Sequence, residues 1–103
     1  MKQLLLLLLI ISGFSYAEAQ TQTGIVKGFV YEKANGEPII GATVSLKDKN
    51  KGTQTNINGF FTLSKIEPGE YTLIITSIGF ENLEKVIKVE ADEANTQKIY
   101  LEK

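Results

Sequence analysis

The sequence predicts an all-β fold, a sandwich or barrel of about seven strands, behind an export signal. After Gln20 the chain consists of short runs of β-branched and aromatic residues. Turn-forming residues separate these runs about every ten positions, and no segment repeats apolar residues with the 3.6-residue period of a helix. At 103 residues, with 43% hydrophobic and 22% charged side chains, the chain has the size and composition of one globular domain.

Residues 1–19 have the features of a cleavable export signal. Lys2 gives a positive start, residues 4–11 are an unbroken apolar run, and Ala17-Glu18-Ala19 has the small-x-small form that signal peptidase recognises. A retained membrane anchor is the alternative, but the apolar run as far as Phe14 is shorter than the roughly 20 residues of a spanning helix. We therefore expect cleavage after Ala19 and a mature domain over residues 20–103.

The first strand is expected over residues 24–32, where the side chains alternate between two faces. Val26 and Val30 share the face predicted to point into the core. Phe29 and Tyr31 fall on the opposite face. This strand carries the first aromatic pair that is predicted to point outward.

The middle of the chain alternates between short strands and turns. A turn at 35–36 precedes a half-buried strand over 42–46, in which alternate residues are apolar. The polar stretch 48–53 is expected to be a turn, and a short strand through 54–55 follows it. The Asn-Gly pair at 58–59 is a strong hairpin signal, because both residues tolerate positive φ.

The remaining strands each place apolar residues in phase, as expected of strands with one face in a core. The in-phase sets are Phe61 and Leu63; Tyr71, Leu73 and Ile75 after the turn Pro68-Gly69; Ile87 and Val89 within 84–90; and Ile99 and Leu101 within 96–101.

Several short motifs follow one another in a recognisable order and spacing. They are Gly28-Phe29-Val30, the run Gly-Glu-Pro-Ile-Ile-Gly-Ala-Thr-Val at 36–44, Gly52-Thr53 with Thr-Asn-Ile-Asn-Gly-Phe-Phe at 55–61, Pro-Gly-Glu-Tyr-Thr-Leu at 68–73, and Ile78-Gly79-Phe80. Over residues 24–101 the chain resembles the carboxypeptidase regulatory-like domain. The resemblance implies a single transthyretin-like or immunoglobulin-like β-sandwich with Greek-key connections.

The chemistry of these motif residues favours a scaffold. Gly41 and Ala42 are expected to let two strands approach closely, and Phe61 and Tyr71 are expected to fill the space between the sheets. The family usually has Asp after the Thr of its third motif, whereas this chain has Asn56. Asn keeps the side-chain hydrogen bond of the turn but removes a charge, which weakens any metal-binding interpretation of that turn.

The resemblance also implies a biological setting. The family is not itself catalytic, and in Gram-negative envelopes it often follows the signal peptide of TonB-dependent outer-membrane receptors, ahead of the plug and barrel. The chain is then either the N-terminal part of a longer receptor or a free-standing exported module.

The composition excludes several kinds of site. The chain contains no His, Cys or Arg, so Ser/His/Asp and Cys/His catalysis, zinc sites and lipid attachment through Cys are excluded. The 11 lysines and 12 acidic residues are scattered, which makes nucleic acid an unexpected partner. The loop at 48–52 echoes a calcium loop, but lysines interrupt it and no closing Glu follows. We expect no enzyme activity, no cofactor and no metal.

Aromatic residues supply the candidate contact surface. Phe29, Tyr31, Phe60 and Tyr100 fall out of phase with the core positions and are expected on the outer faces of their sheets. Such rings can stack on sugars or bury against a protein. The alternative is that they only favour strand formation and cover neighbouring strands. If the first strand is a sheet edge, a partner could also pair with its backbone.

Two functions follow from these observations. The first is an accessory or N-terminal module of a TonB-dependent uptake receptor, in the periplasm or outer membrane, that contacts the plug, the barrel or an associated envelope protein. The alternative is a free-standing carbohydrate-binding or adhesion module that uses the outward aromatic residues.

Overall fold

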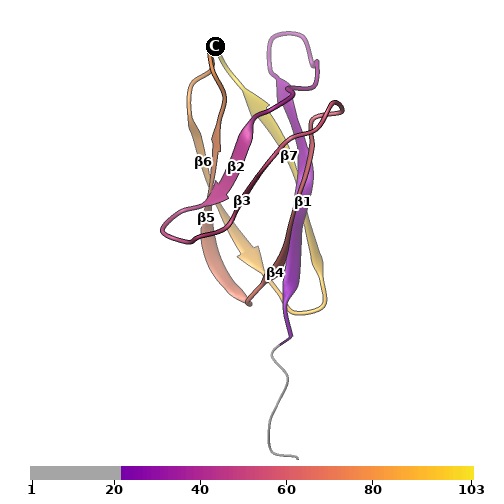
Figure 1. Cartoon of the computed structure of the whole chain (residues 1–103), viewed down its shortest axis with the longest axis vertical. Helices are drawn as coiled ribbons and strands as arrows, with labels where there is room; N and C mark the ends of the chain where they lie inside the picture. The colour runs from indigo at the N-terminus through magenta and orange to yellow at the C-terminus, as the bar shows by residue number, and fades with distance from the viewer. Residues whose placement is uncertain (1–21) are drawn as a thin grey trace, which may run out of the picture.

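The computed structural model describes residues 22–103, which form seven β-strands and no helix (Figure 1). The export signal expected over residues 1–19 lies outside the described residues. Within residues 22–103, no helix meets the length and apolarity needed to cross a membrane. The predicted all-β sandwich of about seven strands is therefore confirmed for the described domain.

One sheet contains three strands in the order β4-β1-β7. These strands are β1 (Gly24–Glu32), β4 (Phe60–Ile66) and β7 (Ala94–Leu101). The central strand β1 is antiparallel to β4 and parallel to β7. Both sides of β1 are thus occupied by neighbouring strands.

The other sheet contains four strands in the order β3-β2-β5-β6, all paired antiparallel. They are β2 (Thr43–Leu46), β3 (Gly52–Gln54), β5 (Gly69–Thr76) and β6 (Leu83–Val89). Figure 1 shows the two sheets packed as two layers, with the orange β6 in one layer and the yellow β7 in the other.

The core lies between the sheets and is built from alternate residues of the strands. The buried apolar side chains are Val26, Val30, Ile39, Ala42, Val44, Leu46, Phe61, Leu63, Ile66, Leu73, Ile75, Ile87, Val89, Ile99 and Leu101. Alternation along the sequence predicted most of this set correctly. Tyr71 is only half-buried and packs against the margin of the core, where its hydroxyl donates to the Glu67 carbonyl at 2.6 Å.

The hairpin predicted at Asn58-Gly59 is wrong, because this turn joins strands of different sheets. Asn56 holds the turn through its side-chain oxygen, which accepts from the backbone N–H groups of Asn58 and Phe60, each at 3.0 Å. The Gly59 carbonyl then accepts from the Val30 N–H at 2.8 Å. The turn is therefore tight, but it leads the chain from β3 across to the sheet that contains β1.

The close approach of strands predicted at Gly41 is found instead at Gly28. Gly41 has a φ of 75° and open space where a side chain would begin, so it supplies a turn conformation. At Gly28, a β-carbon would collide with the backbone carbonyl of Gln97 on β7. Glycine at this position is what allows β1 and β7 to pair so closely.

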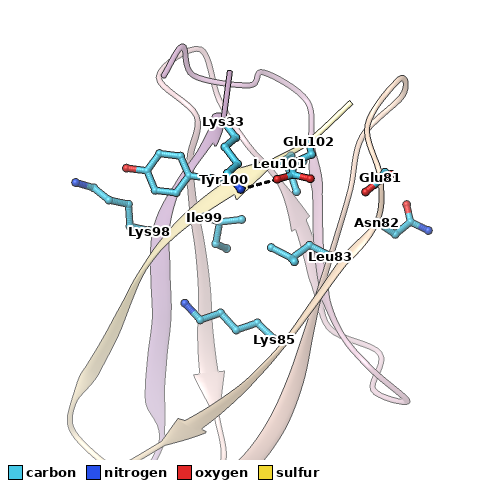
Figure 2. Close-up of a pocket in the computed structure, with 10 residues that line it drawn as sticks. All are labelled: Lys33, Glu81, Asn82, Leu83, Lys85, Lys98, Ile99, Tyr100, Leu101 and Glu102. Atoms are coloured by element: carbon cyan, nitrogen blue, oxygen red, sulfur yellow. Dashed lines mark hydrogen bonds and ion pairs between the residues drawn. The ribbon is translucent and has the colours of Figure 1, made fainter. Parts of the chain in front are cut away.

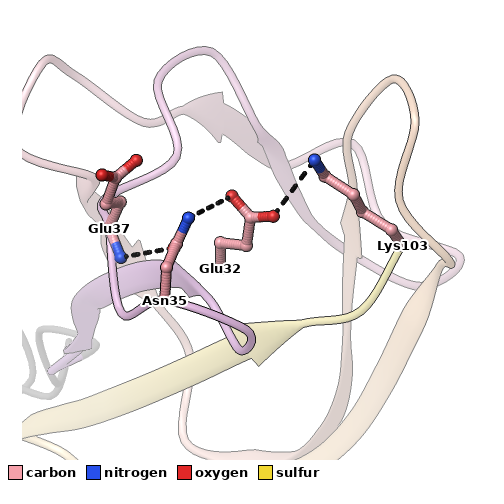
Figure 3. A network of polar contacts seen from close by, with 4 residues as sticks. All are labelled: Glu32, Asn35, Glu37 and Lys103. Atoms are coloured by element: carbon pink, nitrogen blue, oxygen red, sulfur yellow. Dashed lines mark hydrogen bonds and ion pairs between the residues drawn. The ribbon is translucent and has the colours of Figure 1, made fainter.

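A polar network fixes the turn after β1 (Figure 3). The Asn35 amide donates to the Glu32 carboxylate at 3.3 Å, and its carbonyl oxygen accepts from the Glu37 N–H at 3.0 Å. Lys103 forms an ion pair with the same Glu32 carboxylate at 3.2 Å. Gly36, at a φ of 73°, completes the turn that the Asn-Gly pair predicted.

Thr55 is a buried polar residue that ties two loops together. It follows β3, which ends at Gln54, so the short strand predicted through 54–55 stops one residue earlier. Its hydroxyl donates to the Ile39 carbonyl at 2.6 Å and accepts from the Ala42 N–H at 2.9 Å.

Replacing Thr55 with valine is expected to lower the free energy of unfolding by about 1 to 3 kcal/mol, because it leaves two buried backbone groups unsatisfied at nearly constant volume. Urea denaturation of the two proteins measures the difference. A Thr55→Ser variant, which retains the hydroxyl, is the control. Equal losses in both variants would contradict the hydrogen-bonding role.

Candidate functional site

The four aromatic residues predicted to point outward come together on one surface. The register places Phe29 of β1 opposite Phe60 of β4, and Tyr31 of β1 opposite Tyr100 of β7. They therefore form a continuous line across the outer face of the three-stranded sheet, which we call the aromatic row. The sequence predicted that each side chain points outward, and the strand pairing joins them.

The rings of the aromatic row contact one another in sequence. Ring centroids are 5.2 Å apart for Phe60 and Phe29, 6.0 Å for Phe29 and Tyr31, and 5.6 Å for Tyr31 and Tyr100. Phe29 and Tyr31 are stacked at 12°, whereas the two outer pairs are tilted. Tyr100 is 45% exposed and the other three are half-buried. The row is thus a self-packed ridge that still offers apolar surface to solvent.

The charged side chains at outward positions within the three strands are all lysines. Lys27 and Lys98 lie at outward positions of β1 and β7, and Lys98 is directly opposite Phe29 in the register. No Asp or Glu occupies an outward position on β1, β4 or β7. The face combines aromatic rings with ammonium groups, a chemistry suited to a partner that has apolar and acidic side chains.

Strand β1 is the central strand of its sheet, so the condition under which a partner could pair with its backbone is not met. The sequence cannot reveal this, since strand order depends on contacts between distant segments. Backbone pairing with a partner must therefore use another strand.

A groove that the sequence did not predict lies between β6 and β7 (Figure 2). It has a volume of about 490 Å³, and apolar groups of Leu83 and Ile99 line it together with the ammonium-bearing side chain of Lys85. Tyr100 and Lys98 lie along its β7 side, so the groove adjoins the aromatic row. Lys98 and Tyr100 are two residues apart on one strand and therefore share a face. This spacing is the sequence signal that links the groove to the aromatic row.

An exposed ion pair stands at one end of the groove. The Lys33 ammonium donates to the Glu102 carboxylate at 2.6 Å, as the dashed line in Figure 2 shows. This hydrogen bond, reinforced by the opposite charges, raises the pKa of Lys33 and lowers the pKa of Glu102. The stability that the Glu102 carboxylate contributes through this pair is fully present above the ordinary glutamate pKa. It is lost as pH falls through the lowered pKa of Glu102. The stability that the Lys33 ammonium contributes is lost only as pH rises through the raised pKa of Lys33. The ion pair therefore persists at neutral pH.

Replacing Lys33 with alanine is expected to raise the pKa of Glu102 back toward the ordinary glutamate range, because both causes of its depression are removed. A carboxyl-detected NMR titration measures this directly. Lys47→Ala, which removes the ammonium that pairs with Glu84 at 3.4 Å, is the control and leaves Glu102 unchanged. A Glu102 pKa that does not move would contradict the contact.

Within residues 22–103, no group of three or more His, Cys, Asp or Glu side chains could hold a metal ion. The turn after β2, where the sequence echoes a calcium loop, contains Asp48 at a φ of 61° beside exposed lysines.

Comparison with known proteins identifies a family and a relative. A family model described as the CarboxypepD_reg-like domain matches residues 26–103. The TonB-dependent receptor SusC of Bacteroides thetaiotaomicron is 38% identical over 76 residues, which are 74% of this chain. The match spans only 7% of the length of that receptor.

Solved structures share the fold across proteins of different activity. A chain of the cohesin–X-dockerin complex of Acetivibrio cellulolyticus has a TM-score of 0.63 at 25% identity, covering 76% of this chain and 56% of that chain. BcpA, the major pilin subunit of Bacillus cereus, has a TM-score of 0.65 at 22% identity, covering 80% and 30%. The 3-chlorocatechol 1,2-dioxygenase of Rhodococcus opacus 1CP has a TM-score of 0.61 at 14% identity, covering 85% and 62%. Since a pilin subunit, a chain of a cohesin–X-dockerin complex and a dioxygenase share this sandwich, the fold alone does not determine function.

Proposed function

The chain belongs to the carboxypeptidase regulatory-like domain family, and we propose that it is an exported, non-catalytic module of a TonB-dependent outer-membrane uptake receptor that acts through protein contacts. The similarity to SusC carries this proposal, because it covers most of the domain at 38% identity. The features of residues 1–19 support export ahead of the domain.

The available surface supports binding to protein rather than catalysis. The chain has no His or Cys to act as a base or thiolate nucleophile. What the domain does present is the aromatic row with lysines beside it. Aromatic residues are enriched where protein interfaces derive most of their binding energy.

Ring orientation favours a protein partner over a sugar. A sugar-binding platform needs exposed ring faces, but Phe29 and Tyr31 are half-buried and stacked against each other. The outer pairs are tilted by 57° and 33°, which leaves a ridge instead of a flat platform. A protein surface can pack against such a ridge.

The reading frame beyond Lys103 provides the first test of the receptor module. A plug and barrel in the same frame would support it, and fractionation should then place the protein in the outer membrane with the domain cross-linked to an envelope component. A stop codon directly after Lys103, with no envelope protein cross-linked, would favour the free-standing module instead.

Export is expected to leave a mature protein that begins at Gln20 and carries no lipid, because signal peptidase would cleave after Ala19 and the chain has no Cys for acylation. Intact mass and N-terminal peptide analysis of protein recovered from the envelope measure both properties. A variant with Ala17 and Ala19 replaced by leucine is the control and should accumulate uncleaved. A mature pool that retains Met1 would contradict the domain boundary.

A further inference from the structure

Strand β7 is the regular free edge of the three-stranded sheet. Its only strand partner among residues 22–103 is β1, and their parallel register runs without a break along β7. The other edge, β4, is irregular: Lys65 has a φ of 57°, and the register shifts between Gly24 and Val26. Irregular edges resist the addition of a strand, whereas long regular edges favour it.

Two hydrogen bonds establish which backbone groups of β7 point outward. The Leu101 carbonyl accepts from the Lys33 N–H on the β1 side, and the next carbonyl, that of Glu102, accepts from Glu81 on the opposite side. Because successive residues of a strand direct their backbone groups to alternate edges, those of Lys98 and Tyr100 point toward the groove. No hydrogen bond within the described chain satisfies them.

The groove between β6 and β7 has the shape to receive an added strand. The space between the two strands is bounded at one end by the bond from the Glu81 N–H to the Glu102 carbonyl, and at the other by the Asn95 amide, which donates to the Lys88 carbonyl at 2.7 Å. The groove itself lies toward the Glu81 end, between residues 81–85 and 98–102. Between these ends, inward side chains of an added strand would lie over the apolar lining that includes Leu83 (Figure 2). Its outward side chains would extend the outer face beside Tyr100 and Lys98.

Charge identifies the chemistry of the added strand. Lys98 borders its outward side and Lys85 lines its inward side, and neither lysine forms an ion pair among residues 22–103. Outward positions of the three-stranded sheet hold no carboxylate to oppose an acidic partner. The groove also has two carboxylates: Glu102 is paired with Lys33, and Glu81 lies at the end where its N–H bonds to the Glu102 carbonyl. Acidic side chains at outward positions of the added strand would therefore meet the unpaired ammonium group of Lys98.

We infer that the β7 edge binds an extended acidic segment of a protein partner as a fourth strand, with the segment's aliphatic side chains in the groove and its acidic and aromatic side chains beside Lys98 and Tyr100. This inference rests on the proposed function, since it specifies the kind of protein contact. The aromatic row then continues directly into the bound segment.

A pair of blocked seven-residue peptides tests the inference. One alternates valine with glutamate and a central tyrosine, and the other has lysine in place of each glutamate. In an NMR titration of the purified chain, the acidic peptide is expected to bind at least about tenfold more tightly than the basic one. At saturation, hydrogen exchange of the Lys98 and Tyr100 amides is expected to slow by about tenfold or more, because the added strand accepts their hydrogen bonds.

Charge reversal sharpens the test. Lys98→Glu is expected to reverse the preference, so that the basic peptide binds the variant more tightly than the acidic one does. Lys49→Glu, an equal change of charge on the exposed turn after β2, is the control and should keep the preference for the acidic peptide.

The inference would be overturned by equal binding of the two peptides, by binding that leaves the Lys98 and Tyr100 amides unprotected, or by protection that appears at Glu84 and Val86 of β6 instead. A chain that cross-links to an envelope partner but binds neither peptide would overturn the edge site while leaving the receptor module intact. These outcomes separate a failure of this inference from a failure of the proposed function.

Discussion

Replacing Phe61 with alanine is expected to lower the free energy of unfolding by about 3 to 5 kcal/mol, because it removes a large side chain from a core that cannot fully close around the cavity. Phe61 is 1% exposed and is among the largest fully buried side chains of the described domain. It extends from β4 into the space between the sheets. Urea denaturation followed by circular dichroism measures the change.

Phe60, its neighbour in sequence, is the matched control. It points to the outer face, is half-buried, and contacts Phe29 at a ring distance of 5.2 Å. Phe60→Ala should therefore cost much less than Phe61→Ala, since solvent already reaches part of the ring. Equal costs would mean that the register of β4 is shifted by one residue, which would exchange its inner and outer faces.

The sequence was sufficient to predict the faces of the strands but not their order. Alternation identifies Val26 and Val30 as core residues because a strand with one buried face leaves this pattern locally. The sheet to which a strand belongs depends on distant contacts. Asn58-Gly59 illustrates the limit: its local chemistry specifies a tight turn, but the Gly59 carbonyl bonds to Val30, and the chain crosses to the other sheet.

The candidate site was predictable to the same extent. Phase along each strand predicted that Phe29 and Tyr100 point outward, and this required no tertiary information. That these rings lie in one row depends on the pairing of β1 with both of its neighbours. The groove beside the row depends on the packing of β6 and β7, which belong to different sheets. Both properties arise from segments far apart in the sequence, so no local pattern encodes them.

Replacing both Phe29 and Tyr31 with serine is expected to abolish binding of the domain to the proposed envelope partner. These rings form the middle of the aromatic row, and each contacts a further ring on a neighbouring strand. If both rings contribute as aromatic residues at interface centres do, their combined loss weakens binding by about a thousandfold or more. Co-purification with the partner, followed by a titration where the partner is in hand, measures the loss.

The interpretation depends on a control that removes a similar apolar surface elsewhere. Ile74 and Val86 occupy outward positions on β5 and β6 of the other sheet, and Val86 is 64% exposed. The double change of Ile74 and Val86 to serine should leave binding intact, because that sheet does not carry the aromatic row. Circular dichroism must show that both double variants remain folded. If the Phe29 and Tyr31 variant is folded yet keeps every partner, the outer face is inert, and the aromatic residues serve only to stabilise the sheet by covering their neighbours.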